Sequence, residues 1–154
     1  MFHEMRRADR QLSEEVTSRI LEEGEYGILS TVGENGYPYG VPVNYVAFDS
    51  KIFFHCASGV GLKLDNIAFC NKVCFTVVGQ TEILSEVFST KYESIIAIGT
   101  ARKSTNLKQK ALEAIIKKYS SEFMEKGMKY IENAIHMTDI YEIEIESITG
   151  KARR

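Results

Sequence analysis

The stretch Gly36-Tyr37-Pro38-Tyr39-Gly40-Val41-Pro42-Val43-Asn44-Tyr45-Val46-Ala47 decides the fold of this chain. Residues 37–47 have the aromatic and β-branched content of a strand, yet they include both prolines of the sequence. Proline has no N–H to donate to a β-ladder, so we predict that this strand lies at a sheet edge or carries a bulge. Bulges often lie beside functional sites, and a plain edge strand is the alternative.

Strands are predicted on both sides of this stretch. The strand at 26–32 precedes it across the turn Gly33-Glu34-Asn35-Gly36, in which Asn35-Gly36 tolerates positive φ. The strand at 51–57 follows the tight turn Phe48-Asp49-Ser50. Connections this short join antiparallel neighbours, so residues 26–57 are predicted to form a three-stranded meander.

Four helices are predicted outside this meander. The first runs from Ser13, which caps it, to Glu23, with Gly24 as its C-terminal glycine cap. The second covers 62–69, the third opens at a capping box Asn106-x-x-Gln109 and ends near 119, and the fourth covers 121–137.

Three further strands complete the predicted elements, at 72–79, 92–103 and 140–148, while 80–91 is expected to be a loop with helical turns. The last strand alternates strictly and places Glu142, Glu144 and Glu146 on a wet face. Six strands with several helices predict one α+β domain over residues 1–154, in which the antiparallel strands close into a small barrel.

Composition excludes several classes of protein. With 19 Lys and Arg against 21 Asp and Glu, the net charge is −2, which argues against a nucleic-acid module held by bulk charge. No apolar stretch has the length of a membrane span, and the first ten residues lack the apolar core of a signal peptide. Three cysteines make no disulfide framework, so we expect free thiols and a cytoplasmic protein.

The segment from His55 to Asn66 is the first candidate site. A strand ends there, Gly59 and Gly61 make a flexible loop, and a helix begins with Lys63 in its first turn. Unpaired N–H groups at a helix start bind anions, and the lysine adds a full charge. The segment is neither a Walker loop nor a dinucleotide fingerprint. A solvated loop with Lys63 on the surface is the alternative.

Other candidate sites are weaker. His55, Cys56, Cys70 and Cys74 do not have zinc-ligand spacing, so no metal site is predicted. Cys56 is expected to be a buried, unreactive thiol, since no Cys-His-Asn arrangement accompanies it. The tail at 150–154 is either a frayed end or, if the last strand delivers it to a site, a source of cations for an anionic ligand.

Several segments along nearly the whole chain, taken together and in order, resemble one protein family. They are Met5–Arg10, Tyr26–Thr31, Gly36–Tyr45, Phe53–Ala57, Gly61–Asn66, Lys72–Phe75, Lys91–Ser94 with Gly99 and Ala101, and Ile148–Arg153. The ordered set is similar to the pyridoxamine 5′-phosphate oxidase-like FMN-binding split-barrel proteins, in the nitroimidazole-resistance branch.

The resemblance implies a six-stranded antiparallel split β-barrel of Greek-key type with flanking helices. It implies a homodimer with FMN at the subunit interface. Lys63 would hold the phosphate with help from Asn66, Asn44 and Tyr45 would lie beside the flavin ring, and His55 would be the catalytic residue. The implied cofactor-binding residues are Pro42, Val43, Asn44, Tyr45, His55, Cys56, Ala57, Lys63, Leu64, Asn66, Tyr92, Ser94, Lys151 and Arg153, of which Tyr92 and Ser94 would come from the partner chain.

The implied activity is an FMN-dependent oxidoreduction in which a small electrophile such as a nitroimidazole or nitroaromatic is reduced. The chain has no tryptophan and lacks the basic C-terminal motif of true pyridoxamine-phosphate oxidases, so vitamin B6 oxidation is not expected. Two alternatives stay open: a flavin carrier or redox sensor without turnover, and a haem-binding split barrel with His55 or His136 as axial ligand.

Overall fold

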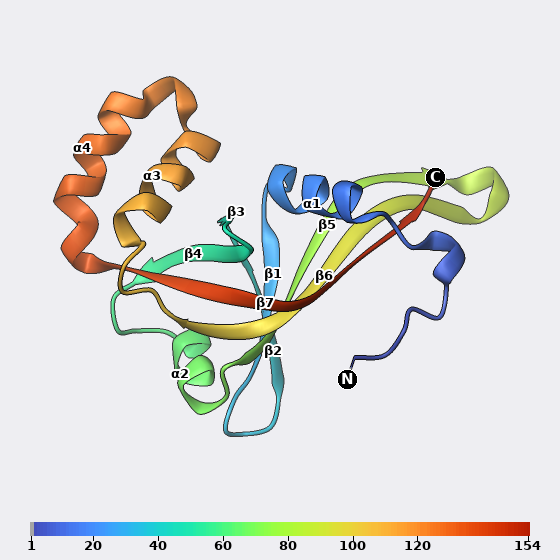
Figure 1. The fold of residues 1–154 in the computed structure, drawn as a ribbon, viewed down its shortest axis with the longest axis horizontal. Helices are drawn as coiled ribbons and strands as arrows, with labels where there is room; N and C mark the ends of the chain where they lie inside the picture. The colour runs from blue at the N-terminus through green and yellow to red at the C-terminus, as the bar shows by residue number, and fades with distance from the viewer. Residues whose placement is uncertain (1) are drawn as a thin grey trace.

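Seven strands form one antiparallel sheet in a computed structural model that describes residues 2–154 (Figure 1). The strand order is β2-β1-β5-β6-β7-β4-β3. The bounds are β1 Gly27–Val32, β2 Pro38–Val43, β3 Tyr45–Phe48, β4 Lys51–Ala57, β5 Lys72–Leu84, β6 Ser89–Lys103 and β7 Thr138–Arg153.

The predicted strand at 37–47 is divided at Asn44, which is why the sheet has seven strands rather than the six expected. Before Asn44 the chain pairs with β1, and after it the chain pairs with β4. These two segments, β2 and β3, are the opposite edges of the sheet. Because one residue joins the two edges, the sheet must curl until they meet, which gives an open barrel. Pro38 and Pro42 both lie in β2, so the prediction of an edge strand is confirmed.

The loop with helical turns predicted at 80–91 is wrong in extent, since only the 3₁₀ turn Ser85–Val87 interrupts the strands. Strand β5 continues to Leu84, and β6 already begins at Ser89. Cross-strand pairing runs to Leu84 and Ser89, past an irregularity between Val78 and Thr81. The polar residues of this segment lie on a solvated hairpin, which explains why their pattern resembled a loop. The hairpin projects from the barrel at the right of Figure 1.

Strand β7 is also longer than the predicted 140–148, since it includes Lys151 and Arg153. Glu144 and Glu146 are exposed as expected, but Glu142 is only 5% exposed. Burial alone would raise the pKa of Glu142, but hydrogen bonds from Lys51, Ser104 and Arg102 outweigh it and lower the pKa. The predicted solvent-exposed face of β7 therefore includes Glu144 and Glu146 but not Glu142, which these side chains cover.

Helix α1, Glu14–Glu23, is capped by Ser13, whose hydroxyl accepts a hydrogen bond from Val16 N–H. Gly24 follows it, but its φ is −57°, so it is not the left-handed cap that the sequence suggested. A Cβ there would lie 2.7 Å from the Tyr45 hydroxyl and would clash with Val77. Close packing, rather than backbone freedom, requires this glycine.

The remaining helices are α2 Leu62–Phe69, α3 Lys108–Tyr119 and α4 Met124–Ala134. Helix α3 begins without a side-chain cap, so the predicted capping box at Asn106 does not form. The predicted helix at 121–137 has 3₁₀ turns at both ends, Ser121–Phe123 and Ile135–Met137. Short 3₁₀ turns of this kind are common at helix ends.

Two hydrophobic cores result. The barrel core contains the fully buried Leu29, Phe54, Phe75 and Ile143 and also takes Ile20 from α1. The second core lies on the outer face of the sheet, where α3 and α4 cover Phe53 and Ile140. The outer face of β5, β6 and the rest of β7 is not covered by these helices (Figure 1). We call the face of the sheet opposite the barrel core the outer face.

Candidate functional site

His55 lies on the outer face near the end of β4, opposite Ile140 of β7. The α3–α4 cover that buries Ile140 leaves the His55 side chain exposed. The surrounding protein still lowers the pKa of His55, first by removing water and second through repulsion from the nearby Lys63 ammonium. At pH 7 the imidazole is therefore neutral, and one ring nitrogen donates while the other accepts.

The loop after β4 brings Lys63 back toward His55. Gly61 has a φ of +122°, which a side chain would strain, and helix α2 begins directly after it. The N–H groups of Leu64 and Asp65 are bonded to the Gly61 carbonyl. Lys63 is half-buried in the first turn. The structure thus places His55, Lys63 and a helix start within one segment, and the predicted order of strand end, glycine loop and helix is confirmed.

Two other predicted residues of this segment face inward. Leu64 is 7% and Asn66 is 4% exposed. The Asn66 amide donates to the Thr31 hydroxyl at 3.0 Å, and this bond ties α2 to β1. Leu64 and Asn66 therefore pack α2 against the barrel. Of the three residues, Lys63 is the one whose charge acts on His55.

Cys56 is buried and points away from the surface that His55 occupies. Its Sγ lies 3.7 Å from the Asp139 carbonyl oxygen. Burial raises the pKa of the Cys56 thiol, and the Lys63 charge opposes this only in part. The thiol is therefore protonated at neutral pH and is not a ready nucleophile. Its neighbour Ala57 is exposed at the strand end.

The corner between β2 and β3 holds four predicted residues in different surroundings. Pro42 and Asn44 are exposed, whereas Val43 is half-buried. Tyr45 lies beside Phe54 in the β3–β4 register, so the next position, Asn44, comes next to His55. The Tyr45 side chain itself is fully buried and its hydroxyl donates to the Leu21 carbonyl. Contrary to expectation, Tyr45 is a core residue and its ring does not face an open site.

A second group of predicted residues lies far along the same outer face. Ser94 is opposite Lys151, and Tyr92 is opposite Arg153. Arg10, from the segment before α1, donates a hydrogen bond to the Tyr92 hydroxyl at 3.4 Å. This bond, followed by the nearby Lys151 charge, lowers the pKa of Tyr92. The C-terminal tail is therefore part of β7, and it places Lys151 and Arg153 near Tyr92.

The register measures the separation of the two groups. His55 is opposite Ile140, and Ser94 is opposite Lys151, eleven positions further along β7. At about 3.3 Å per residue this is roughly 35 Å of strand. We call His55, Lys63 and the start of α2 the His55 group, and we call Arg10, Tyr92, Ser94, Lys151 and Arg153 the Tyr92 group. The two groups are therefore at opposite ends of the uncovered face, and one small ligand does not span both within one chain.

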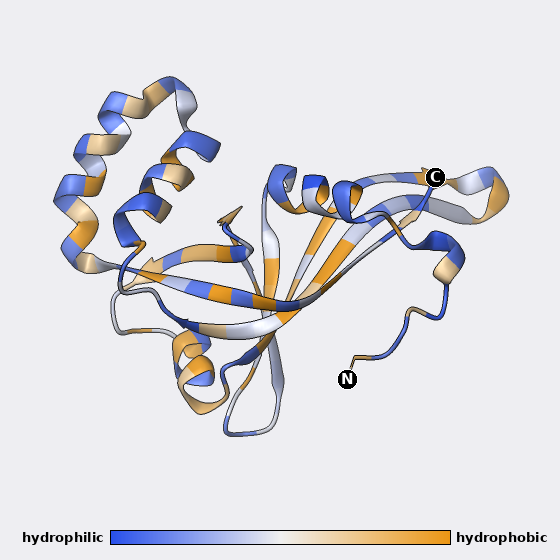
Figure 2. Ribbon diagram, viewed as in Figure 1, coloured by the Kyte–Doolittle hydropathy of each residue, from blue (hydrophilic) through white to orange (hydrophobic). Residues whose placement is uncertain are grey.

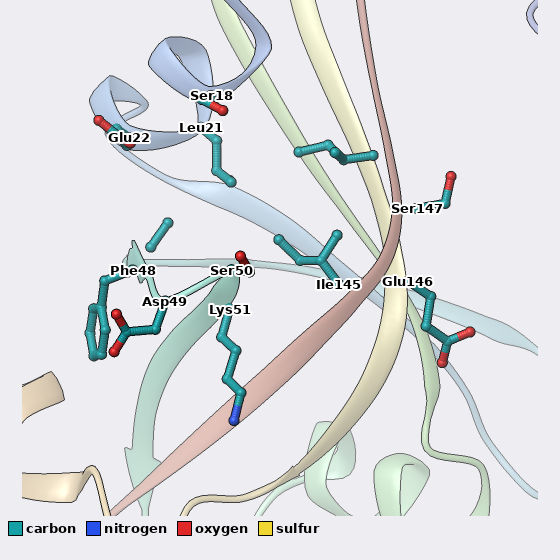
Figure 3. Close-up of a pocket in the computed structure, with 12 residues that line it drawn as sticks. Ser18, Leu21, Glu22, Phe48, Asp49, Ser50, Lys51, Ile145, Glu146 and Ser147 are labelled. Atoms are coloured by element: carbon teal, nitrogen blue, oxygen red, sulfur yellow. The ribbon is translucent and has the colours of Figure 1, made fainter. Parts of the chain in front are cut away.

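Surface hollows of similar size differ in whether predicted residues line them. One of about 480 Å³ lies between α1, the β3–β4 turn and β7, with Ser18, Leu21, Asp49 and Ile145 among its lining residues (Figure 3). It contains none of the predicted residues. A second, of about 410 Å³, includes Tyr92 and Arg153, and a third, of about 430 Å³, includes Asn44 together with Lys118 and Tyr119.

Within residues 2–154 no three His, Cys, Asp or Glu side chains gather as ligands of a metal ion would. His136 lies exposed in the 3₁₀ turn after α4. No helix described in the structure is both long and apolar enough to span a bilayer.

The sequence model named "Pyridoxamine 5′-phosphate oxidase" matches residues 13–152. The chain belongs to this family. A search of curated proteins finds no match.

Solved structures share the fold of this family member. A protein from Bacteroides thetaiotaomicron, named for 5-nitroimidazole antibiotic resistance, is 19% identical with a TM-score of 0.78, over 92% of this chain and 86% of that one. A conserved hypothetical protein from Mycobacterium tuberculosis is 15% identical with a TM-score of 0.82, over 98% and 91%. An FAD- and haem-binding protein from Mycobacterium smegmatis is 16% identical with a TM-score of 0.81, over 94% and 74%.

Two residues that the sequence did not assign to a site stand out in this member of the oxidase family. Arg10 was part of a recognised segment, but its bond to Tyr92 spans 82 positions and has no local signal. Lys118 carries a buried amine without a hydrogen-bond partner among the described residues. That amine lies 4.0 Å from the centre of the Tyr45 ring, and burial lowers its pKa to about 8. Neither residue belongs to a sequence motif that could have predicted its position.

Proposed function

We propose that this protein is a homodimeric FMN-binding oxidoreductase that reduces a small electrophile such as a nitroimidazole or nitroaromatic compound. The observation that carries the proposal is the pairing of a neutral, exposed His55 with a half-buried Lys63 at the start of α2. Family membership over residues 13–152 supports the choice of cofactor class. Flavin is also named for proteins of similar fold, among them the FAD- and haem-binding one.

The residues of the His55 group fit a flavin phosphate. The segment 56–64 carries one cation, Lys63, and the carboxylate that follows it, Asp65, is exposed on α2. A helix start supplies backbone N–H donors and a positive dipole end to an anion. One lysine suits the single phosphate of FMN better than the diphosphate of FAD. The exposed corner at Pro42 and Asn44, next to His55, offers a surface for the ring.

A flavin bound there would supply two-electron transfer, and the chain would supply position and charge. Lys63 holds the anionic phosphate. His55 is neutral, so its N–H can donate a hydrogen bond to an oxygen of the substrate, such as that of a nitro group. The Arg10–Tyr92–Lys151 group, with Arg153, provides positive charge for an electron-rich ring edge.

The dimer follows from the separation of the two groups. Neither end of the uncovered face is a complete site. Between the two ends the face carries charged pairs such as Lys72–Glu146, and beside them lies a patch with exposed apolar side chains. Ile28, Thr76 and Ile96 lie in one cross-strand row, and Val78 and Ile96 are 53% and 45% exposed. Two copies packed face to face about a two-fold axis would cover these side chains and bring each His55 group to the Tyr92 group of the partner.

The visible absorption spectrum of the purified protein, with mass analysis of what heat releases, tests the cofactor. The expected result is a two-banded flavin spectrum with the mass of FMN. Release of FAD would contradict the choice of FMN but keep a flavoprotein. A protein that stays colourless with excess FMN would contradict flavin binding, and a Soret band would support the haem alternative instead.

Turnover separates the enzyme from a flavin carrier. Steady NAD(P)H-dependent reduction of a nitroaromatic compound by the flavin-loaded protein is the expected result. A flavoprotein that transfers no electrons to a panel of such acceptors would favour the carrier or redox-sensor alternative.

A further inference from the structure

The projecting β5–β6 hairpin ends in an apolar tip that residues 2–154 leave exposed. Ile83 is 78%, Val87 is 62% and Phe88 is 97% exposed. Phe88 has a left-handed backbone, with φ of +50°, and this conformation turns the chain at the tip. The tip residues 83–88 lie at one end of the molecule, beyond the C-terminus (Figure 1), and Figure 2 shows apolar colour at the turn.

A second exposed apolar cluster lies at the other end, beside the His55 group. Val60 and Leu62 in the loop before α2 are 64% and 53% exposed, and Met137 is 69% exposed. The Ser58 N–H donates to the Met137 carbonyl at 3.0 Å, so the loop and Met137 lie together. We call Val60, Leu62 and Met137 the rim of the His55 group.

We infer that in the dimer the hairpin tip of one chain packs on the rim of the His55 group of the other chain and closes that flavin site. The inference rests on the proposed dimer. It assigns to the hairpin a partner, the second copy of this chain, and a role in covering the cofactor.

Strand register carries the geometry. The proposed two-fold axis brings Ile140 of one chain to the position along the strands of Lys151 of the other. Arg153 lies two positions beyond Lys151. Arg153 is opposite Tyr92, so it marks the start of the free part of the hairpin. The same rotation places Tyr92 near the first residue of β7 in the partner. Packed sheets keep their strands roughly aligned, within about 30°. Phe88 at the tip lies just before β6 and four positions before Tyr92. It therefore reaches past that point, where the rim lies.

The charge and composition of the hairpin tip fit the rim of a second copy of this chain. Within residues 83–90 Glu86 is the one charged residue. The rim lies next to Lys63, in the first turn of α2, and the carboxylate of Asp139 near it is already paired with Lys103; Glu86 can therefore face a cation around an apolar centre, as in a typical protein interface. The contact also extends the apolar face formed by Val78 and Ile96, which lies on the same hairpin nearer the barrel. An acidic tip of this kind does not suit an anionic lipid surface.

Photo-crosslinking in the flavin-loaded protein tests the contact. Phe88 is replaced by p-benzoylphenylalanine, and the variant is mixed with ¹⁵N-labelled unmodified chains before irradiation. The expected crosslink joins position 88 to a labelled peptide within 57–62 or 135–138. The same replacement at Ile96 reports the dimer face, and at Phe123, which is 62% exposed on a 3₁₀ turn, it is the control.

The outcomes separate the two claims. Crosslinks between chains from position 96, with none from 88 to the rim, would overturn the hairpin contact and leave the dimer. No crosslinks between chains from either position, with a monomer in sedimentation, would overturn both.

A kinetic comparison adds a second readout. Phe88→Ser is expected to speed flavin release about tenfold, the size of a modest interface hot spot. Tyr130→Ser, which removes a 68% exposed aromatic ring from α4, is expected to leave release unchanged. Equal release rates for Phe88→Ser and the unaltered protein would contradict the covering role.

Discussion

Arg10 donates a hydrogen bond to the hydroxyl of Tyr92, 3.4 Å away. The bond joins the segment before α1 to β6, and together with Lys151 it lowers the pKa of Tyr92. A tyrosine hydroxyl held by cations is a better partner for an anionic or electron-rich ligand than for a neutral one. Neither Arg10 nor Tyr92 is among the residues of the two hydrophobic cores, and in the function proposed above this arrangement serves the ligand.

Tyr92→Phe tests this role. The change removes the hydroxyl and keeps the ring, so we expect FMN to bind about fivefold to tenfold more weakly, the effect of one lost hydrogen bond. The melting temperature of the apoprotein should not change. Tyr37→Phe is the control, because Tyr37 is 74% exposed on the β1–β2 turn. Equal dissociation constants for both variants in fluorescence titrations would remove Tyr92 from the site.

Lys63→Ala is expected to weaken FMN binding far more. A charge-assisted contact to a phosphate is worth roughly 1.5–3 kcal/mol, which is about ten- to hundredfold in the dissociation constant. Lys117→Ala removes an exposed lysine from α3 and is the control. Riboflavin, which has no phosphate, should bind both variants and the unaltered protein alike. A Lys63 variant that loses riboflavin and FMN equally would contradict a phosphate contact.

His55→Ala is expected to leave the fold intact, because the side chain is exposed, and to slow reduction of the nitro substrate at least tenfold. The lowered pKa of His55 means that the neutral form serves the reaction. Activity of the unaltered protein should therefore fall as pH drops through that pKa, below the ordinary value of about 6.5. His55→Ala should lack this pH step. An unchanged profile in the variant would assign the step to another group.

Lys118→Met tests the buried amine over Tyr45. The folded pKa of about 8 lies below the ordinary value of 10.5, so the unfolded chain binds the proton more tightly. The charged lysine therefore costs stability below pH 8, and the cost disappears as pH rises to about 10.5. We expect Lys118→Met to raise the free energy of unfolding by about 1–2 kcal/mol at pH 7, with a smaller gain at pH 10. Urea titrations at both values measure it, and a loss of stability at pH 7 would show that the cation–π contact dominates.

Patterns within one element were enough to predict much of the fold. The prolines at 38 and 42 predicted an edge strand, and the short turns predicted the antiparallel meander. The division of the predicted strand at Asn44 could not be predicted. It arises because the chain changes its pairing partner there when the barrel closes, which leaves Asn44 exposed and buries Tyr45. The hairpin at 80–91 was missed because both of its strands are solvated, so no apolar alternation marks them.

The candidate site was predicted only where its residues are close in sequence. His55 near the end of β4 and Lys63 at the start of α2 are joined by one short loop, so they are close in sequence. The packing of Tyr45 against Leu21 and of Asn66 against Thr31 depends on residues 24 and 35 positions away. The sequence therefore could not show that these side chains face inward.

Subunit complementation tests the central claim, that each flavin site is built from the His55 group of one chain and the Tyr92 group of the other. Lys63→Ala impairs the first group and a Lys151→Ala, Arg153→Ala double variant impairs the second, so each homodimer should bind FMN weakly at both sites. A mixed dimer has one doubly impaired site and one intact site. We expect it, purified with two different tags, to bind one FMN per dimer with the affinity of the unaltered protein. A mixed dimer that binds FMN no better than its parents would contradict a site shared between chains.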